Sequence, residues 1–509
     1  MDSYQLKNKL ANIFAVIAAA SLLTVLVVVV ALKIHVNSDA IAPYSFARDI
    51  IEHIPIWHWQ FPAPPFTFPD YAVSLFIVFF LKQPWQWFLG SALAQPLTLI
   101  LFLTFRKDKT GLTKPIKFVG ICYLFILIFV LGSIFFNHAW IESPARIVVL
   151  VHHMYAAIMA ILLFLWTTPE NNLKLNSKLF IFYSALCFIL AFSDLFFMVY
   201  FFALAFARIC VYQTTILRNL SWLVEMIILF LIALLGIYLN YRINPGFSVQ
   251  LHQTTPLTTF AERLSGFVHI THLRGVILFF ILPIVLLSLY IKKTQPSVEK
   301  NTIAALSLGC IFIGIIVVGA GLITAIYTLR YLGIYFPAMI FIASQLTTNK
   351  LYQIAVQPII SFGVILIAFI IGIFTLHNIP ERFLAPEFST LYSCPDFQQQ
   401  SRGGIVVATY WPAKVLFEQN NRQFRLLQTD PTLEFIYHWI YNPEWYNPQY
   451  MQSSQQSSKV FFVRYQMDPN KLQKLSLLPD AQSICNNEMI MLPLSPKLTQ
   501  LAPVLKETS

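Results

Sequence analysis

Long apolar runs recur along the first three quarters of the chain and predict a bundle of membrane-spanning helices. A run of about 20 apolar residues can cross the hydrocarbon core of a bilayer as a helix. A separate, shorter run at 71–82 ends just before Pro84 and is expected to form a helix on the membrane surface. The eleven longer runs are 12–32, 84–105, 116–136, 147–166, 178–193, 195–210, 219–240, 272–291, 302–325, 331–346 and 353–376.

The hydrophobic pattern changes after residue 376. The segments GGIVVATYW and KVFFVRYQM are typical of strands, and helices are expected near 411–420 and 431–440. The fold class is therefore a polytopic α-helical membrane protein with a C-terminal extracytoplasmic α/β domain. We expect a transmembrane domain at 1–376, whose first outer loop is 35–70, and a soluble domain at 377–509.

Composition and charge support a membrane protein. The chain is 57% hydrophobic and only 11% charged, which is unusual for a soluble protein of this length. Its net charge of +11 comes from Lys and Arg that gather in alternate loops, which the positive-inside rule places in the cytoplasm. No nucleic-acid partner is expected. The N-terminus is then cytoplasmic, and loop 35–70 and the C-terminal domain face the periplasm of a bacterial inner (plasma) membrane.

The six cysteines are distributed between the predicted spans and the soluble domain. Cys394 and Cys485 lie in the soluble domain, while the other four lie in or at the ends of predicted spans. In an oxidising compartment such a pair is expected to form a disulfide. Two free thiols are the alternative.

The first outer loop contains an unusual number of acids. If 40–54 is helical, Asp39 lies at its start, where it serves either as a helix cap or as a partly desolvated general base. Asp49 and Glu52 are either site residues or solvated surface charges. Asp70 ends the aromatic segment WHWQFPAPPFTFPD, which suits a sugar platform as well as an interfacial belt. Asp70 is a catalytic candidate or a simple helix-start residue.

Other polar residues cluster at the predicted outer ends of the spans. Their alternative roles are an interfacial histidine pair, a Ser-Asp turn and snorkelling arginines beside the membrane. Neither a Cys/His zinc pattern nor an HExxH motif is present, so no metal site is expected. The candidates for substrate binding are His152, His153, Asp194, Arg274, Arg330 and Tyr331.

The motifs NSDAIAPYSFARDI, FPD, the SD of Ser193–Asp194, ATYWPAKVLF and the RY of Arg330–Tyr331 give the chain a plan that resembles GT-C fold glycosyltransferases. Protein O-mannosyltransferases and aminoarabinose transferases are examples. The resemblance implies inverting transfer of a sugar from a polyprenyl-phosphate donor to a glycan, lipid or protein acceptor, without a cofactor. Asp39, with Asp70 second, would be the base, and Arg330 would bind the lipid phosphate, helped by Arg274.

Three other function classes remain open. A transporter or flippase of a lipid-linked saccharide would place polar residues deep in several spans and show two related halves. A polymerase or ligase of the O-antigen type would carry its large loop late in the chain. A structural protein would leave the acidic first loop without a purpose.

Overall fold

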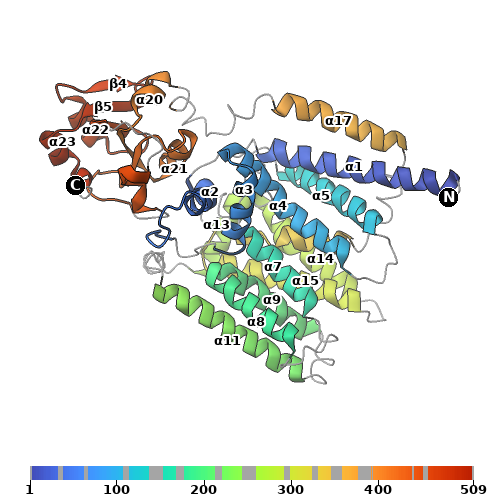
Figure 1. Ribbon diagram of the computed structural model, residues 1–509. Coiled ribbons are helices and arrows are strands. Elements are labelled where there is room, and N and C mark those ends of the chain that lie inside the picture. The colour runs from blue at the N-terminus through green and yellow to red at the C-terminus, as the bar shows by residue number, and fades with distance from the viewer. Residues whose placement is uncertain are drawn as a thin grey trace.

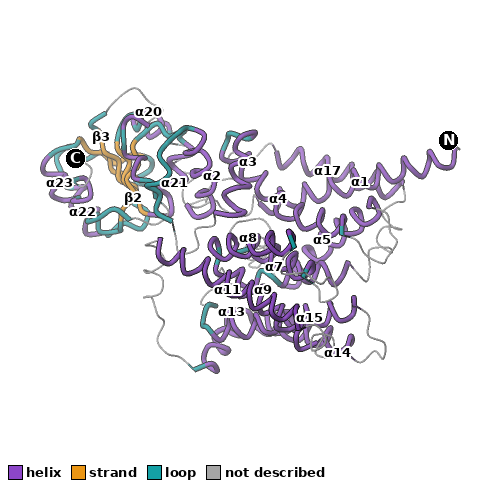
Figure 2. The backbone as a smooth tube through the Cα atoms, turned by 60° about the horizontal axis from the view of Figure 1, so that its bottom comes forward, coloured by secondary structure: helices purple, strands orange, loops and turns teal. Residues whose placement is uncertain are grey.

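The computed structural model consists of a long helical body with a small α/β domain at one end. Figure 1 shows the N-terminus at the far end of the helical body from this domain, and Figure 2 shows the strands gathered in the domain alone. The structure describes residues 3–31, 38–61, 67–106, 114–136, 153–167, 177–211, 220–243, 259–291, 298–323, 331–344, 358–376, 391, 394–437, 441–450 and 457–506.

Each of the predicted apolar runs contains a described helix. Among the described residues, four helices are long and apolar enough to cross a membrane, namely Leu10–Val29, Pro84–Phe105, Leu220–Ile243 and Lys300–Gly319. The number eleven and the orientation stay predictions. The bounds of the helices are α1 Ser3–Ala31, α4 Pro84–Phe105, α5 Lys114–Phe136, α7 Met154–Trp166, α8 Lys178–Ser193, α9 Leu195–Val211, α11 Leu220–Ile243, α13 Phe260–Val276, η3 Ile277–Ile281, α14 Leu282–Ile291, α15 Val298–Gly319 and α17 Pro358–Leu376.

Helix α13 begins earlier than the pattern predicts, inside the expected 241–271 loop. Its start is a capping box, because the Thr259 side chain accepts from the Glu262 amide (3.3 Å) while the Glu262 carboxylate accepts from the Thr259 amide (2.7 Å). The T-x-x-E spacing was the available sequence signal.

Helices α8 and α11 pack closely because α11 has a glycine at their contact. A Cβ on Gly236 of α11 would lie 2.6 Å from the Phe188 carbonyl oxygen of α8.

The first outer loop contains two helices, α2 Ser38–Ile51 and α3 Ala72–Phe80. Helix α2 begins slightly before the expected 40–54 segment, so Asp39 lies in its first turn. Helix α3 confirms the helix predicted at 71–82, and it has two contrasting faces. Phe76 and Phe79 are exposed, whereas Ser74 is buried.

The C-terminal domain is a mixed five-stranded sheet in the order β2-β1-β3-β5-β4. The central pairs β1–β2 and β1–β3 are parallel, and β3–β5 and β4–β5 are antiparallel. The parallel β1–β2 pair needs a crossover, which α21 supplies. The bounds are β1 Ile405–Thr409, β2 Arg425–Thr429, β3 Lys459–Val463, β4 Gln482–Ile484, β5 Met489–Pro493, α20 Pro395–Gln400, α21 Tyr410–Gln419, α22 Pro469–Ser476 and α23 Pro496–Leu501.

Several predictions for this domain are confirmed, and one is wrong. The two strand segments, the helix near 411–420 and the Cys394–Cys485 disulfide are all present. The helix predicted at 431–440 is absent from its described part, 431–437. The chain forms a tight loop there instead, because the Asp430 carboxylate accepts hydrogen bonds from the Thr432 and Glu434 amides (2.8 and 2.9 Å).

The first outer loop and the C-terminal domain share one hydrophobic core. Val406 and Ala408 of β1 face a cluster that includes Ala42 of α2 and Trp59 of the loop. The loop also pairs with the domain through the Gln60–Tyr441 bridge. The domain therefore holds the loop against the helical body, as Figure 1 shows for α2 and α21.

Candidate functional site

The break between α8 and α9 places a carboxylate inside the helical body. Asp194 has an extended backbone between the two helices and is only 5% exposed. Its Oδ1 accepts from the Phe196 amide at 2.9 Å, which caps α9. Its Oδ2 lies 2.8 Å from His153 Nδ1. The Ser-Asp interruption thus pairs with one of the two predicted histidines.

His153 is held by backbone geometry and by aromatic rings. It precedes α7 with φ +72°, in the left-handed region. Its ring centroid lies 4.5 Å from that of Phe196 and 5.3 Å from that of Tyr331. Tyr331 and Phe196 stack with centroids 4.6 Å apart. Three of the predicted substrate-binding residues, His153, Asp194 and Tyr331, therefore lie together.

Asp70 joins this group from the first outer loop. It lies in the short helical turn η1 Thr67–Tyr71, outside the four candidate spans, and is 8% exposed. The Phe68 amide donates to Ser193 Oγ at 2.9 Å, which ties this turn to the α8–α9 junction. Burial raises the pKa of Asp70 to about 8, and the nearby Asp194 carboxylate adds to the increase.

A second set of buried charges lies where the first loop meets the C-terminal domain. Arg422 donates to Asp49, to Glu418 Oε1 (2.6 Å) and to Glu52 Oε2 (3.1 Å). Arg48 donates to Glu418 Oε2 (3.0 Å) and to Glu52 Oε1 (2.6 Å). Burial disfavours ionised Glu418, but Arg422 and Arg48 outweigh it and lower the pKa of its carboxyl. We call these five residues the junction network.

Asp49 is the centre of the junction network and is completely buried. Besides Arg422, it accepts from Asn442 Nδ2 (2.7 Å) and from the indoles of Trp59 (2.7 Å) and Trp445 (3.1 Å). The surface-charge interpretation of Asp49 is therefore wrong. Trp59 is buried here, so it is not a free sugar platform, although Trp57 is 77% exposed.

A cleft opens beside the junction network, between α2, the end of α3, the start of α4 and α21. Its volume is about 550 Å³, which is within the range of small-molecule sites. Its lining combines charged and polar residues, among them Arg48, Lys82 and Gln83, with apolar ones such as Ile51 and Phe79. The cleft can hold an amphiphile whose polar group meets Lys82.

The remaining predicted residues are only partly visible. Asp39 and Arg274 lie in α2 and α13, and their side chains are outside the described part of the structure. His152 and Arg330 are entirely outside the described residues. Among the residues that are described, no group of three His, Cys, Asp or Glu side chains lies in a metal-binding arrangement.

Sequence reasoning missed the junction network because its partners are far apart in the chain. Arg422 and Asp49 are separated by 373 residues. The only local hint was that Arg48 and Glu52, like Glu418 and Arg422, are spaced i, i+4 on a helical pattern. No pattern in the sequence pairs one helix with the other.

Comparisons with known proteins found nothing similar: no family model, no curated protein and no solved structure matches the chain. The functional interpretation therefore rests on the sequence and on the geometry of the described residues.

Proposed function

We propose that this protein is a membrane glycosyltransferase that moves a sugar from a polyprenyl-phosphate donor to an extracytoplasmic acceptor, with Asp70 as the proton-accepting residue. The observation that carries the proposal is the burial of Asp70 beside a second carboxyl, Asp194, which is paired with His153. A carboxyl with a pKa near neutral pH is suited to general acid–base chemistry.

The reaction follows from these groups. The acceptor hydroxyl gives its proton to the Asp70 carboxylate through intervening water, because Asp70 lies about 12 Å from the cleft at the usual helical rise, while the acceptor oxygen forms a bond to the anomeric carbon. The bond from that carbon to the phosphate oxygen breaks, and the lipid phosphate leaves with the electron pair. One displacement of this kind inverts the anomeric centre. Because the leaving group is already a phosphate, the chain needs no nucleotide-binding loop.

The residues at and near the cleft support the proposal that the donor is lipid-linked. Phe76, Phe79 and Phe80 are exposed on α3. Such an exposed apolar surface suits contact with acyl or prenyl chains. Lys82 is exposed and forms no ion pair within the described residues, so its ammonium group is available to a phosphate. Glu52 and Glu418 also lie at the cleft, but both are engaged by arginines and would have to give up these ion pairs to accept a proton.

Asp39 is the base that the family resemblance implies, and the described geometry favours Asp70. Arg330 and Tyr331, with Arg274, His152, His153 and Asp194, stay proposed substrate contacts. Tyr331, the neighbour of Arg330 in sequence, packs on His153.

The test compares Asp70→Asn and Asp39→Asn in native membranes supplied with radiolabelled polyprenyl-phosphate sugars. The assay measures release of free polyprenyl phosphate and label in the acceptor fraction. We expect Asp70→Asn to lower donor cleavage by about 10²- to 10⁴-fold, the usual contribution of a general base. Lys82→Ala should mainly raise the donor KM, while Lys474→Ala, at an exposed lysine of α22 far from the cleft in sequence, should change nothing.

The alternative, a flippase of a lipid-linked saccharide, gives a different result in the same membranes. The labelled donor would cross the bilayer with its sugar–phosphate bond intact. Protein-dependent transbilayer movement without any donor cleavage would overturn the glycosyltransferase proposal.

A further inference from the structure

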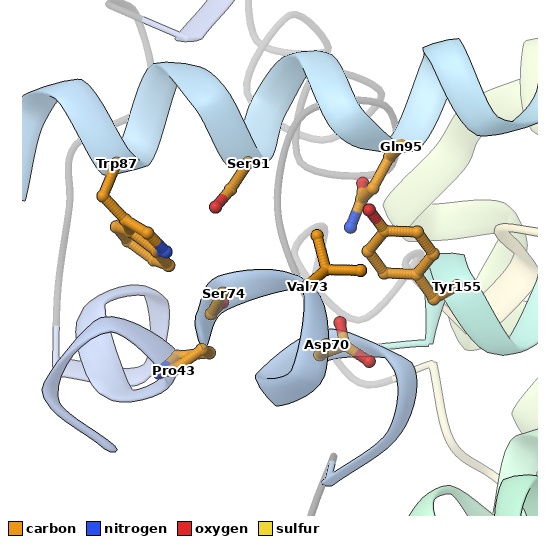
Figure 3. A pocket seen from close by; sticks show the side chains of 8 residues that line it. All are labelled: Pro43, Asp70, Val73, Ser74, Trp87, Ser91, Gln95 and Tyr155. Atoms are coloured by element: carbon orange, nitrogen blue, oxygen red, sulfur yellow. The ribbon is translucent and has the colours of Figure 1, made fainter. Parts of the chain in front are cut away.

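A small cavity lies between Asp70 and the start of α4. It is lined by Pro43, Asp70, Val73, Ser74, Trp87, Ser91, Gln95 and Tyr155. Figure 3 shows Gln95 and Tyr155 on the side of the cavity where Asp70 lies, with Trp87 at the opposite end and Ser91 between them. Its volume of about 10 Å³ leaves room for roughly one water molecule.

Several polar atoms in the lining of this cavity lack a hydrogen-bond partner within the described residues. Trp87 Nε1, Ser91 Oγ and Gln95 Oε1 are buried and have no hydrogen-bond partner in the part of the chain that the structure describes. Trp87 is 0% and Gln95 3% exposed. Each buried polar atom without a partner costs about 1–3 kcal/mol. Three such atoms on one cavity wall indicate that something polar occupies the space.

The three polar side chains lie in a row along one helix. Trp87, Ser91 and Gln95 follow one another at intervals of four residues and so share one face of α4. Gln83, the residue just before α4, lines the cleft. On the facing helix, Ser74 lines the cavity and Val78 lines the cleft. The cavity and the cleft are thus consecutive along the α3–α4 contact.

An aromatic pair links the linings of the two spaces. Tyr44 lines the cleft and Trp87 lines the cavity, and their ring centroids lie 5.5 Å apart. The Tyr44 hydroxyl donates to the Lys82 carbonyl oxygen at 2.7 Å. Along α3, the distance from Asp70 to Val78 at the cleft is about 12 Å at the usual helical rise.

We propose that the cavity is a water site, and that this water and the Ser91 hydroxyl relay protons between Asp70 and the cleft, while Trp87 and Gln95 hold the water in place. Water can both donate and accept, so a water in the cavity can accept from the indole or the hydroxyl and can donate to the hydroxyl or the amide oxygen. A proton that Asp70 takes up leaves through this path when the carboxyl is regenerated. The ionisable groups that interact with Asp70 are Asp194, which His153 pairs with, and Tyr155, and none of these three residues lines the cleft.

This inference rests on Asp70 as the acid–base group of the proposed transfer, but its test needs no sugar donor. The full-length protein in lipid nanodiscs is studied by infrared spectroscopy at about pH 6, where the Asp70 carboxyl is protonated, since its pKa is about 8. The carboxyl band that disappears in Asp70→Asn belongs to Asp70. Replacing H₂O by D₂O then shifts this band at the rate of proton exchange.

We expect Asp70 in the double variant Ser91→Ala, Gln95→Leu to exchange at least about tenfold more slowly than in the wild type, because the path loses two hydrogen-bonding groups. Both changes remove unsatisfied polar atoms, so folding should be preserved. Trp87→Phe, a milder change, should slow exchange to a smaller extent. Thr104→Val is the matched control, because its hydroxyl donates to the Ile100 carbonyl oxygen of its own helix.

Exchange at the wild-type rate in the double variant would overturn the water path, as would the absence of an Asp70 carboxyl band. Equal slowing by Thr104→Val would also overturn it. Slow exchange in the double variant with no donor cleavage by the wild type would support the path and reject the glycosyltransferase proposal, so the two can fail separately.

Discussion

Asp49 and Asp70 come from the same outer loop, both are buried, and their surroundings are opposite. Asp49 faces Arg422, Asn442 and two indole N–H groups. Asp70 faces another carboxyl, and no arginine or lysine of the described residues forms an ion pair with it. A buried charge is tolerated when it is paired, whereas an unpaired acid keeps its proton.

The contrast separates a structural role from a chemical one. The junction network compensates its three carboxylates with two guanidinium groups and so fixes the C-terminal domain on α2. The acid cluster of Asp70, Asp194 and His153 holds two carboxyls with one imidazole. Retaining such an uncompensated pair is costly, which is typical of a site kept for function.

The largest effect is expected from breaking the junction network. Arg422→Met leaves Asp49 and Glu418 buried without their main partner, and this should lower the free energy of unfolding by about 3–5 kcal/mol. Denaturant unfolding followed by tryptophan fluorescence measures it. Arg402→Met, an exposed arginine in the same domain, is the control, and equal losses in both variants would contradict a structural role.

A smaller effect is expected from the pair in the acid cluster. His153→Leu strips Asp194 of its partner and should lower stability by about 1–3 kcal/mol. Adding Asp194→Asn removes the stranded charge and should recover part of that loss. Thermal unfolding of both single variants and the double variant measures the coupling. Strictly additive losses would show that the two side chains do not act as a pair.

The pH dependence of stability should differ between the two regions. The pKa of Asp70 rises from 3.8 to about 8 on folding, so the folded state holds the extra proton between these values. Stability should therefore fall as the pH rises through this window, by up to roughly 1.4 kcal/mol per pH unit. Asp70→Asn should remove this slope, and an unchanged slope would contradict the assignment.

Glu418 should have the opposite pH dependence. Its pKa is lowered from 4.5 in the folded state, so its contribution is present above about pH 4.5 and is lost as the pH falls through the lower folded value. Glu418→Gln should reduce the pH dependence of stability only in this acidic range. A loss of stability at higher pH instead would mean that the carboxyl is not held ionised.

The smallest effect is expected at the rim of the junction. His58 and Glu444 form a 2.7 Å pair, but His58 is half-exposed. His58→Ala should change stability by only about 0–1 kcal/mol, because water screens such pairs. A loss comparable with that of Arg422→Met would show that the stability of the junction does not depend on its buried charges.

The sequence predicted what depends on local pattern. The apolar runs, the strands around Val406 and Phe461, and the Cys394–Cys485 pair follow from composition and periodicity, and all are present. The polar break at Asp194 was visible because charge is rare inside apolar runs. The early start of α13 was readable from Thr259 and Glu262, but its capping box was overlooked.

The partnerships between distant segments could not be predicted. Asp49 looked like a surface charge because its partners come from the C-terminal domain, and Asp70 looked no more important than Asp39. Burial is decided by the packing of α2 on α21 and of the first loop on the α8–α9 junction. The line of Trp87, Ser91 and Gln95 acquired a meaning only when a cavity beside Asp70 was found.

The most direct test of the account is donor cleavage by Asp70→Asn and Asp49→Asn, measured in the same membranes at matched amounts of folded protein. The account predicts that Asp70→Asn is stable and loses cleavage by about 10²- to 10⁴-fold. It predicts that Asp49→Asn is less stable, and that its remaining folded fraction cleaves the donor at nearly the wild-type rate. Wild-type cleavage by Asp70→Asn would contradict the central claim.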